Sequence, residues 1–175
     1  MVHFVLESHK NCDRSRGVIS PAGVSPKQFF NTKLTNTMDI QVAVLCDYAA
    51  DYQGKLCVQG AFDTLFARQF PVIHPACALA LRLCLTPEDS GDHKLGISIV
   101  DEDGTPLDKE RMPIVGDLKV ALPEGAAFLT RNLIMNFQGL RFEKTGNYSI
   151  DITLDGELVQ RTPLRLVQVA QPDQQ

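Results

Sequence analysis

The stretch that decides the fold runs from residue 39 to residue 75 and reads DIQVAVLCDYAADYQGKLCVQGAFDTLFARQFPVIHP. Its first part alternates with the period of two that is typical of an extended strand, and β-branched side chains favour that pleated surface. One face of this strand carries Ile40, Val42, Val44 and Cys46, and the other carries Gln41, Ala43, Leu45 and Asp47.

A turn and a returning strand complete a predicted hairpin. Residues Asp51-Tyr52-Gln53-Gly54 supply turn chemistry, because Gly54 adopts positive φ without steric cost. Lys55–Phe62 then reads as the second strand, in which Gly60 indicates a bulge or a close backbone approach. The apolar segment Leu65–Pro75 is expected to be a long loop that covers one end of the core.

Length and composition favour one soluble domain. The chain has 175 residues, 44% of them hydrophobic, which is enough to bury a core. A formal net charge of −4 makes nucleic acid a poor partner. No run of 18 apolar residues is present, and the apolar patch at the N-terminus is too short for a signal-peptide core. We therefore expect a cytoplasmic protein that does not span a membrane.

The cysteines argue against a metal cofactor. There are five, at positions 12, 46, 57, 77 and 84, and no two of them form a CxxC pair. A structural zinc site needs close Cys pairs with further Cys or His residues nearby. We expect reduced, structural thiols and no cofactor.

The N-terminal part differs from the rest of the chain. Up to residue 38 it carries five basic and two acidic residues, whereas the remainder carries 12 basic and 19 acidic residues. Residues 1–37 are therefore either a basic arm that reaches a partner or its own body, a disordered extension, or residues upstream of a true start at Met38. The predicted domain is 38–169, and 170–175 is a tail.

Six further strands follow by the same alternation: Ala76–Thr86, Leu95–Ile99, Met112–Leu122, Ala127–Phe137, Tyr148–Leu154 and Glu157–Gln168. The dipeptide Asp155-Gly156 predicts the tight turn of a hairpin, and Pro163 predicts a bulge or an edge position. The run Asp101-Glu102-Asp103-Gly104 reads as an acidic turn, because the later ligands of an EF-hand calcium loop are missing.

The sequence Gly146-x-Tyr148-x-Ile150 is typical of a tyrosine corner, in which a Tyr hydroxyl ties a loop to the sheet. The expected fold is all-β: an immunoglobulin-like antiparallel β-sandwich of about eight strands with an N-terminal extension. Ile150 stands where an antibody domain has its cysteine, and the chain has no Trp, so a true antibody-type domain is not expected.

Scattered motifs resemble a family of small uncharacterised bacterial proteins. They are CDYA, GKL, GAFD, FP and HP between residues 46 and 75, DEDG at residues 101–104, and GLRF with GxY between residues 139 and 148. The resemblance covers about Met38 to Val169. It implies a compact β-sandwich of bacterial origin and no known activity, so no catalytic residue is carried over.

One group of polar residues near the first hairpin could form a catalytic or metal-binding site. Its members are Asp47, Asp51, Asp63, Arg68 and His74, and an Asp–His pair could orient a general base or, with a second carboxylate, hold a metal. Alternatively His74 closes the loop through a hydrogen bond and Asp63 caps a loop amide. No phosphate-binding, dinucleotide-binding or nucleophile-elbow motif is present.

Two functions follow. The first is a non-enzymatic interaction or assembly module, because sheet edges pair with other chains. The alternative is a small-ligand or metal-binding protein, and through that site an enzyme, that uses Asp47, Asp63, Arg68 and His74. A protein partner is expected under the first hypothesis, while its identity and the oligomeric state stay open. The basic arm could also steer the protein to an acidic surface.

Overall fold

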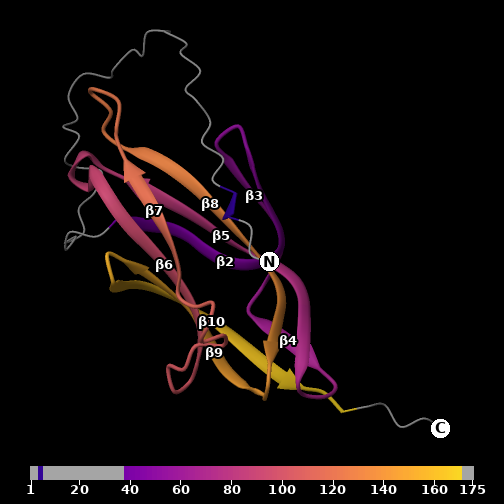
Figure 1. Ribbon diagram of the computed structural model, residues 1–175. Coiled ribbons are helices and arrows are strands. Elements are labelled where there is room, and N and C mark those ends of the chain that lie inside the picture. The colour runs from indigo at the N-terminus through magenta and orange to yellow at the C-terminus, as the bar shows by residue number, and fades with distance from the viewer. Residues whose placement is uncertain (1–3, 6–37, 171–175) are drawn as a thin grey trace.

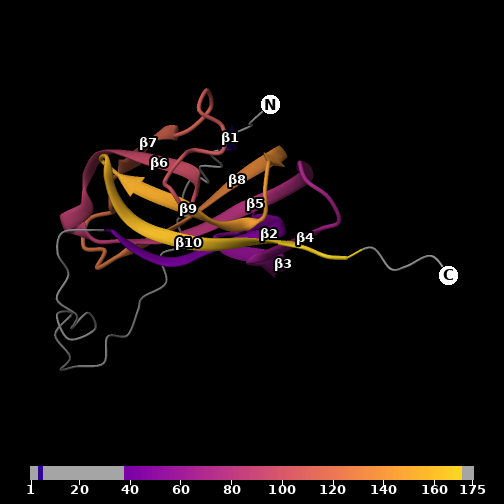
Figure 2. The same cartoon turned by 90° about the horizontal axis from the view of Figure 1, so that it is seen from below.

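The protein folds into two β-sheets that face each other (Figures 1 and 2). The computed structural model describes residues 4, 5 and 38–170. In this part of the chain there are ten strands: β1 Phe4–Val5, β2 Asp39–Tyr52, β3 Lys55–Phe62, β4 Thr64–Ala67, β5 Val72–Leu85, β6 Gly91–Asp101, β7 Ile114–Val120, β8 Leu129–Phe142, β9 Gly146–Leu154 and β10 Glu157–Gln168. The all-β prediction is confirmed. Most of the predicted 1–37 arm and of the 170–175 tail lies outside the described residues.

The two sheets have five strands each. One sheet has the order β1-β8-β5-β2-β3 and the other the order β4-β10-β9-β6-β7. Neighbouring strands are antiparallel except β4 and β10, which run parallel. The chain passes from the first sheet to the second at Asp63, between β3 and β4. Strands β1 and β4 account for the difference from the expected eight, because both are too short to show a period.

The core lies between the sheets and follows the predicted alternation. Its fully buried side chains come from strands of both sheets: Leu79, Leu81, Leu83 and Leu85 on β5, Ile97 and Ile99 on β6, Ile150 and Ile152 on β9. Each such side chain stabilises the fold by about 1.5–3 kcal/mol relative to an exposed one. This packing holds the outer faces and edges of the sheets in place.

The prediction for the first strand is wrong at its start. A register irregularity lies between Ile40 and Val42 where β2 pairs with β5. An extra residue at such a bulge reverses the faces that follow, so Ile40 packs against the main core with Leu45 rather than with Cys46.

The segment Leu65–Pro75 is not a long loop. Thr64–Ala67 forms β4, which pairs with Arg165–Gln168 of β10, and β5 already begins at Val72. The segment nevertheless packs against the buried cluster, through Leu65 among others. Strand β8 likewise continues past the predicted end at Phe137.

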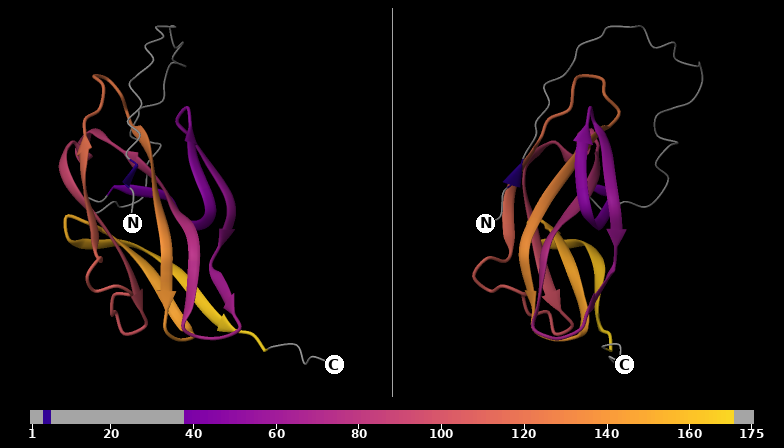
Figure 3. Two further views of the ribbon diagram at one scale, coloured as in Figure 1. Left: turned by 45° about the vertical axis from the view of Figure 1, so that its right-hand side comes forward. Right: turned by 90° about the vertical axis from the view of Figure 1, so that its right-hand side faces the viewer.

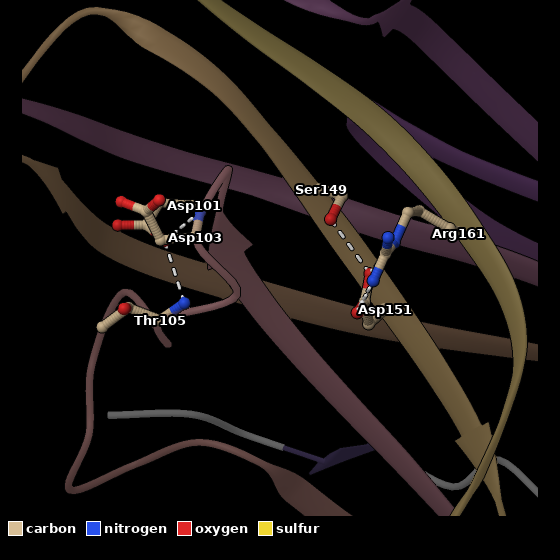
Figure 4. Close-up of polar contacts among 6 residues, drawn as sticks. All are labelled: Asp101, Asp103, Thr105, Ser149, Asp151 and Arg161. Atoms are coloured by element: carbon tan, nitrogen blue, oxygen red, sulfur yellow. Dashed lines mark hydrogen bonds and ion pairs between the residues drawn. The ribbon is translucent and has the colours of Figure 1, made fainter.

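Several predicted turns are confirmed. Asp155 and Gly156 have φ of 52° and 89° and connect β9 to β10, as a type I′ turn requires. Tyr148 donates a 3.1 Å hydrogen bond to the carbonyl of Lys144, four residues upstream. In the acidic turn, the carboxylate of Asp101 accepts the backbone N–H groups of Asp103 and Thr105 (Figure 4).

Candidate functional site

The β2–β3 hairpin folds back over the outer face of its own sheet. Strand β2 pairs with β5 only from Asp39 to Cys46, and beyond that point it pairs with β3 alone. Figure 3 shows this distal half as a separate layer outside β5 and β8. The hairpin therefore presents one face to the sheet and the other to solvent.

The change of direction occurs where Asp47 lies opposite Gly60. Gly60 has a φ of +66°, which residues with a side chain rarely adopt. A Cβ at this position would also overlap the carboxylate of Asp47. The sequence predicted a bulge or a close backbone approach at Gly60, and the group that comes close in the structure is the side chain of Asp47, one of the candidate site residues.

A polar network anchors the hairpin tip to the sheet. Asn132 on β8 donates a 2.6 Å hydrogen bond to Asp51 and accepts one of 2.8 Å from Arg82 on β5. The Arg82 guanidinium also reaches the carbonyl of Gly54 at 3.3 Å and the hydroxyl of Thr130 at 3.1 Å. These contacts hold the tip against β5 and β8.

Small apolar side chains fill the space beneath the hairpin. Ala49 of β2 is buried with Ala78 and Ala80 of β5, and Leu56 and Ile134 pack against this cluster. The alanines leave room for a close approach of two layers, so the hairpin lies on the sheet with a small second core.

The outer face of the hairpin exposes two large aromatic side chains. Tyr48 and Tyr52 are 60% and 62% exposed, and both alternate with the inward-facing Ala49 and Asp51. Cys57 of β3, which pairs with Ala50, is exposed on the same side. Within the described chain, β3 pairs only with β2, so its other edge is open.

Of the four candidate ligand residues, His74 lies within the electrostatic influence of the Asp47 carboxylate, but no hydrogen bond or ion pair joins these two described side chains. His74 packs its ring edge-on against Phe62, with centroids 5.7 Å apart. Burial lowers the pKa of His74, and the Asp47 carboxylate and a hydrogen bond with the Ala76 backbone oppose that change. The buried Nε2 of His74 has no hydrogen-bond partner in the described structure.

The other two candidates serve the crossing between the sheets. The Asp63 carboxylate accepts a 2.9 Å hydrogen bond from the Thr64 hydroxyl, and its carbonyl accepts the N–H of Arg165. The carbonyl of Arg68 accepts a 3.2 Å hydrogen bond from the side chain of Gln168. Across the described ranges no three His, Cys, Asp or Glu side chains are arranged to hold a metal ion.

The outer face of the second sheet carries an ion pair between β9 and β10 (Figure 4). Arg161 of β10 binds Asp151 of β9 through two hydrogen bonds of 2.7 and 2.6 Å, and Ser149 donates a third to Asp151. The guanidinium lowers the pKa of Asp151. Because the Asp151 carboxylate accepts all three of these hydrogen bonds, we assign the pair the structural role of joining β9 to β10.

A hollow of about 300 Å³ lies beside the end of β8. Its lining includes apolar side chains from residues 107–114 and from β8, together with polar and charged ones: Leu107, Asp108, Lys109, Arg111, Met112, Ile114, Phe137, Gln138, Gly139, Leu140, Arg141 and Glu143. Sequence reasoning did not find this hollow, nor the roles of Arg82 and Asn132. The available signal in the sequence was the presence of Arg82 and Asn132 in the middle of otherwise apolar strands, where a polar side chain needs a hydrogen-bond partner.

The sequence comparison identifies the family. A model of the family of unknown function DUF6941 matches residues 41–167, so the chain belongs to that family. No curated protein matches the chain. In the described ranges, no helix is long and apolar enough to cross a membrane.

Two of the similar solved structures are enzymes of much greater length. A Pseudomonas fluorescens alkylpurine DNA glycosylase AlkC, bound to DNA containing an abasic site analog, is 9% identical with a TM-score of 0.41. The match covers 74% of this chain and 30% of the glycosylase. A β-glucuronidase of glycoside hydrolase family 2 is 14% identical with a TM-score of 0.30, over 54% of this chain and 11% of that enzyme. The chain thus spans less than a third of either enzyme.

Proposed function

We propose that this protein is a non-enzymatic interaction module that binds another protein through the outer face of the β2–β3 hairpin. The observation that carries the proposal is the exposure of Tyr48 and Tyr52 on a hairpin that is anchored from beneath. Tyrosine is enriched at protein interfaces because it offers a large apolar area and a polar tip at a low cost in side-chain entropy.

The rigidity of the hairpin supports this assignment. Its inward face is held by the contacts of Asn132 and Arg82 and by the packing of Ala49 on Ala78 and Ala80. A preorganised surface loses less entropy on binding than a mobile one. The open edge of β3 adds backbone groups that an extended partner segment can pair with.

A pull-down from a bacterial lysate tests the proposal. The bait is the full chain, and the test variant is Tyr48→Ser/Tyr52→Ser. The matched control is Phe128→Ser/Leu158→Ser, because Phe128 and Leu158 are 53% and 52% exposed and lie outside the hairpin. We expect the captured protein to be lost with the first variant and retained with the second. Equal capture by both variants, or no capture by the wild type, contradicts the proposal.

We further propose that residues 38–169 form one immunoglobulin-like unit in the cytoplasm, with 1–37 as a basic arm and 170–175 as a tail. The tyrosine corner at Tyr148 and the facing sheets support the first part. Limited proteolysis tests the boundaries, since cleavage within 38–169 before cleavage at the termini would contradict them.

A second candidate function is small-ligand or metal binding at Asp47 and His74. It is favoured by the buried Nε2 of His74, which lacks a hydrogen-bond partner in the described residues and lies in the field of the Asp47 carboxylate. Metal analysis and thermal-shift screening of the wild type and of His74→Ala test this site. A ligand that stabilises both proteins equally, or none at all, contradicts it.

A further inference from the structure

Strand β8 has a long outer edge that is only briefly occupied. On one side β8 pairs with β5 along nearly its whole length, from Leu129 to Phe142. On the other side β1 pairs with it at two positions, Phe4 opposite Met135 and Val5 opposite Ile134. In the described part of the chain the rest of this edge has no backbone partner.

The edge of the opposite sheet lies beside it. Among the described strands β7 pairs only with β6, and its Lys119 carbonyl accepts a 2.8 Å hydrogen bond from Arg131 of β8. Figure 1 shows β7 and β8 close together on this side of the molecule. The two sheet edges therefore run near each other and are joined at this point by Arg131.

The hollow lies farther along β8, beyond the two positions that pair with β1. Because β1 runs antiparallel to β8, the path from Val5 to Phe4 leads along β8 from Ile134 to Met135 and on to Phe137. Phe137 lines the hollow. A strand that lies on the β8 edge and extends past Phe4 thus enters the hollow end-on.

The hollow combines apolar side chains with charged ones, among them the exposed Lys109. Its two arginines are each paired, Arg111 with Asp108 at 3.3 Å and Arg141 with Glu143 at 2.7 Å. In β-strand addition, backbone hydrogen bonds give affinity and pockets for alternate side chains give specificity.

We propose that the β8 edge and its hollow form a binding groove for an extended polypeptide with large apolar residues at every second position. The chain's own strand β1, Phe4–Val5, is the resident occupant of this groove. It lies in the sequence MVHFVLE, whose apolar residues include those at positions 2, 4 and 6. Directly opposed residues share one face of a sheet, and on β8 that face carries the buried Met135 and Phe137.

This groove is a second surface of the proposed interaction module and does not involve the hairpin tyrosines. Its test is therefore independent of the pull-down described above. A negative result with the tyrosine variant does not contradict the groove, and a negative result in the peptide experiment does not contradict binding by the hairpin.

A labelled peptide with the sequence of residues 1–10 measures the groove directly. Fluorescence polarisation compares its binding to the wild-type full chain and to the full-length variant Phe4→Pro/Val5→Pro. Neighbouring N–H groups of a strand point to opposite edges, so two prolines remove whichever one faces β8. We expect the peptide to bind the variant at least about tenfold more tightly, because the resident segment competes in the wild type. A peptide that carries the same two prolines is the control.

Hydrogen exchange locates the binding. The amides of residues 129–142 should be more protected in the wild type than in the proline variant, and the added peptide should restore their protection. Leu107→Lys should weaken peptide binding at least about tenfold, since a charge replaces an apolar side chain of the hollow, while Val115→Lys on β7 should not. If Leu107→Lys fails to fold, the hydrogen-exchange data on the proline variant decide whether the peptide binds along β8.

Three results would overturn the proposal. They are equal binding of the peptide and its proline control, unchanged protection of residues 129–142 on peptide addition, and a wild-type dimer that becomes monomeric in the proline variant. The last result would assign the strand on β8 to a second copy of the chain.

Discussion

Asn132 on β8 and Asp51 near the tip of the β2–β3 hairpin are joined by a 2.6 Å hydrogen bond from Nδ2 to Oδ2, across 81 positions of the sequence. The same amide accepts a hydrogen bond from Arg82 through its oxygen. One half-buried side chain thus links the hairpin to two strands of the sheet beneath it.

Replacement of Asn132 should release the hairpin tip. Asn132→Ala removes the contacts to Asp51 and Arg82, and we expect a loss of about 1–2 kcal/mol in the free energy of unfolding. Faster hydrogen exchange should be confined to residues 50–58, because fewer contacts hold that segment. The control is Asn136→Ala, an exposed position on the same strand. Identical exchange in both variants would show that the network does not anchor the hairpin.

Gly60→Ala should be more destabilising than its backbone angle alone explains. Gly60 and Gly139 have nearly equal φ, +66° and +65°, but only Gly60 has a neighbour, Asp47, in the space of an added Cβ. Gly139→Ala therefore measures the backbone term, about 1–2 kcal/mol, and Gly60→Ala should exceed it. Urea unfolding gives both values.

A double variant isolates the steric part of this cost. Asp47→Ala should recover the excess of Gly60→Ala over Gly139→Ala, because the overlapping carboxylate is gone. If the effects of Asp47→Ala and Gly60→Ala on the free energy of unfolding simply add in the double variant, the Asp47 side chain moves aside at no cost.

The sequence predicted the core strands well, because period-two patterning is a local property. The alternation of Leu79, Leu81 and Leu83 and the dipeptide Asp155-Gly156 each specify their own geometry within a few residues. Strand β4 was missed because four residues show no period, and its partner is β10, about 100 residues away.

The candidate site was predictable only in part. Side-chain type and proximity in sequence brought Asp47 and His74 into consideration, and in the structure burial lowers the pKa of His74 while the Asp47 carboxylate opposes that change. The return of the hairpin over the sheet could not be predicted, since alternation does not specify where a strand bends. Arg82 and Asn132 are directly opposed on β5 and β8, 50 positions apart, and alternation does not specify which strands pair or in which register.

The hydroxyl of Tyr148, which forms the tyrosine corner, should contribute to the stability of the fold. Tyr148→Phe removes the hydrogen bond to Lys144 but keeps the edge-on contact of the ring with Phe142, whose centroid is 5.1 Å away. We expect a loss of about 1 kcal/mol in the free energy of unfolding. Tyr52→Phe, with an exposed ring, should leave stability unchanged. A similar effect of both substitutions would assign the loss to a cause other than the hydrogen bond.

His93 should make stability depend on pH. Its Nδ1 lies 2.8 Å from the Asp155 carboxylate and its Nε2 lies 3.1 Å from the Asp89 carbonyl, so the doubly protonated ring satisfies both acceptors. The hydrogen bond with Asp155 raises the pKa of His93 above 6.5, and the same bond lowers the pKa of Asp155 below 3.8.

The sign follows from linkage. Because the pKa of His93 is raised in the folded state, its contribution to stability is complete below pH 6.5 and is lost as the pH rises through the folded-state pKa. The contribution of Asp155, whose pKa is lowered, is lost only in strong acid. The stability difference between wild type and His93→Gln should therefore be larger at about pH 5.5 than at about pH 8.5 in urea unfolding. Arg161→Gln is the control, because Asp151 and Arg161 keep their charges across that range. A His93→Gln difference that does not change with pH would contradict the assigned role.

The four cysteines of the described chain should differ sharply in reactivity. Burial raises the pKa of Cys77 to about 12, and burial also raises the pKa of Cys46 and Cys84. A thiol reacts as its thiolate, so these three should resist alkylation in the native state, whereas the exposed Cys57 should be modified first. Mass spectrometry of peptides after a timed iodoacetamide pulse measures each site. Urea should abolish the difference, because the unfolded thiols have similar pKa values. Native labelling of Cys77 at the rate of Cys57 would mean that the two sheets separate on the time scale of the reaction.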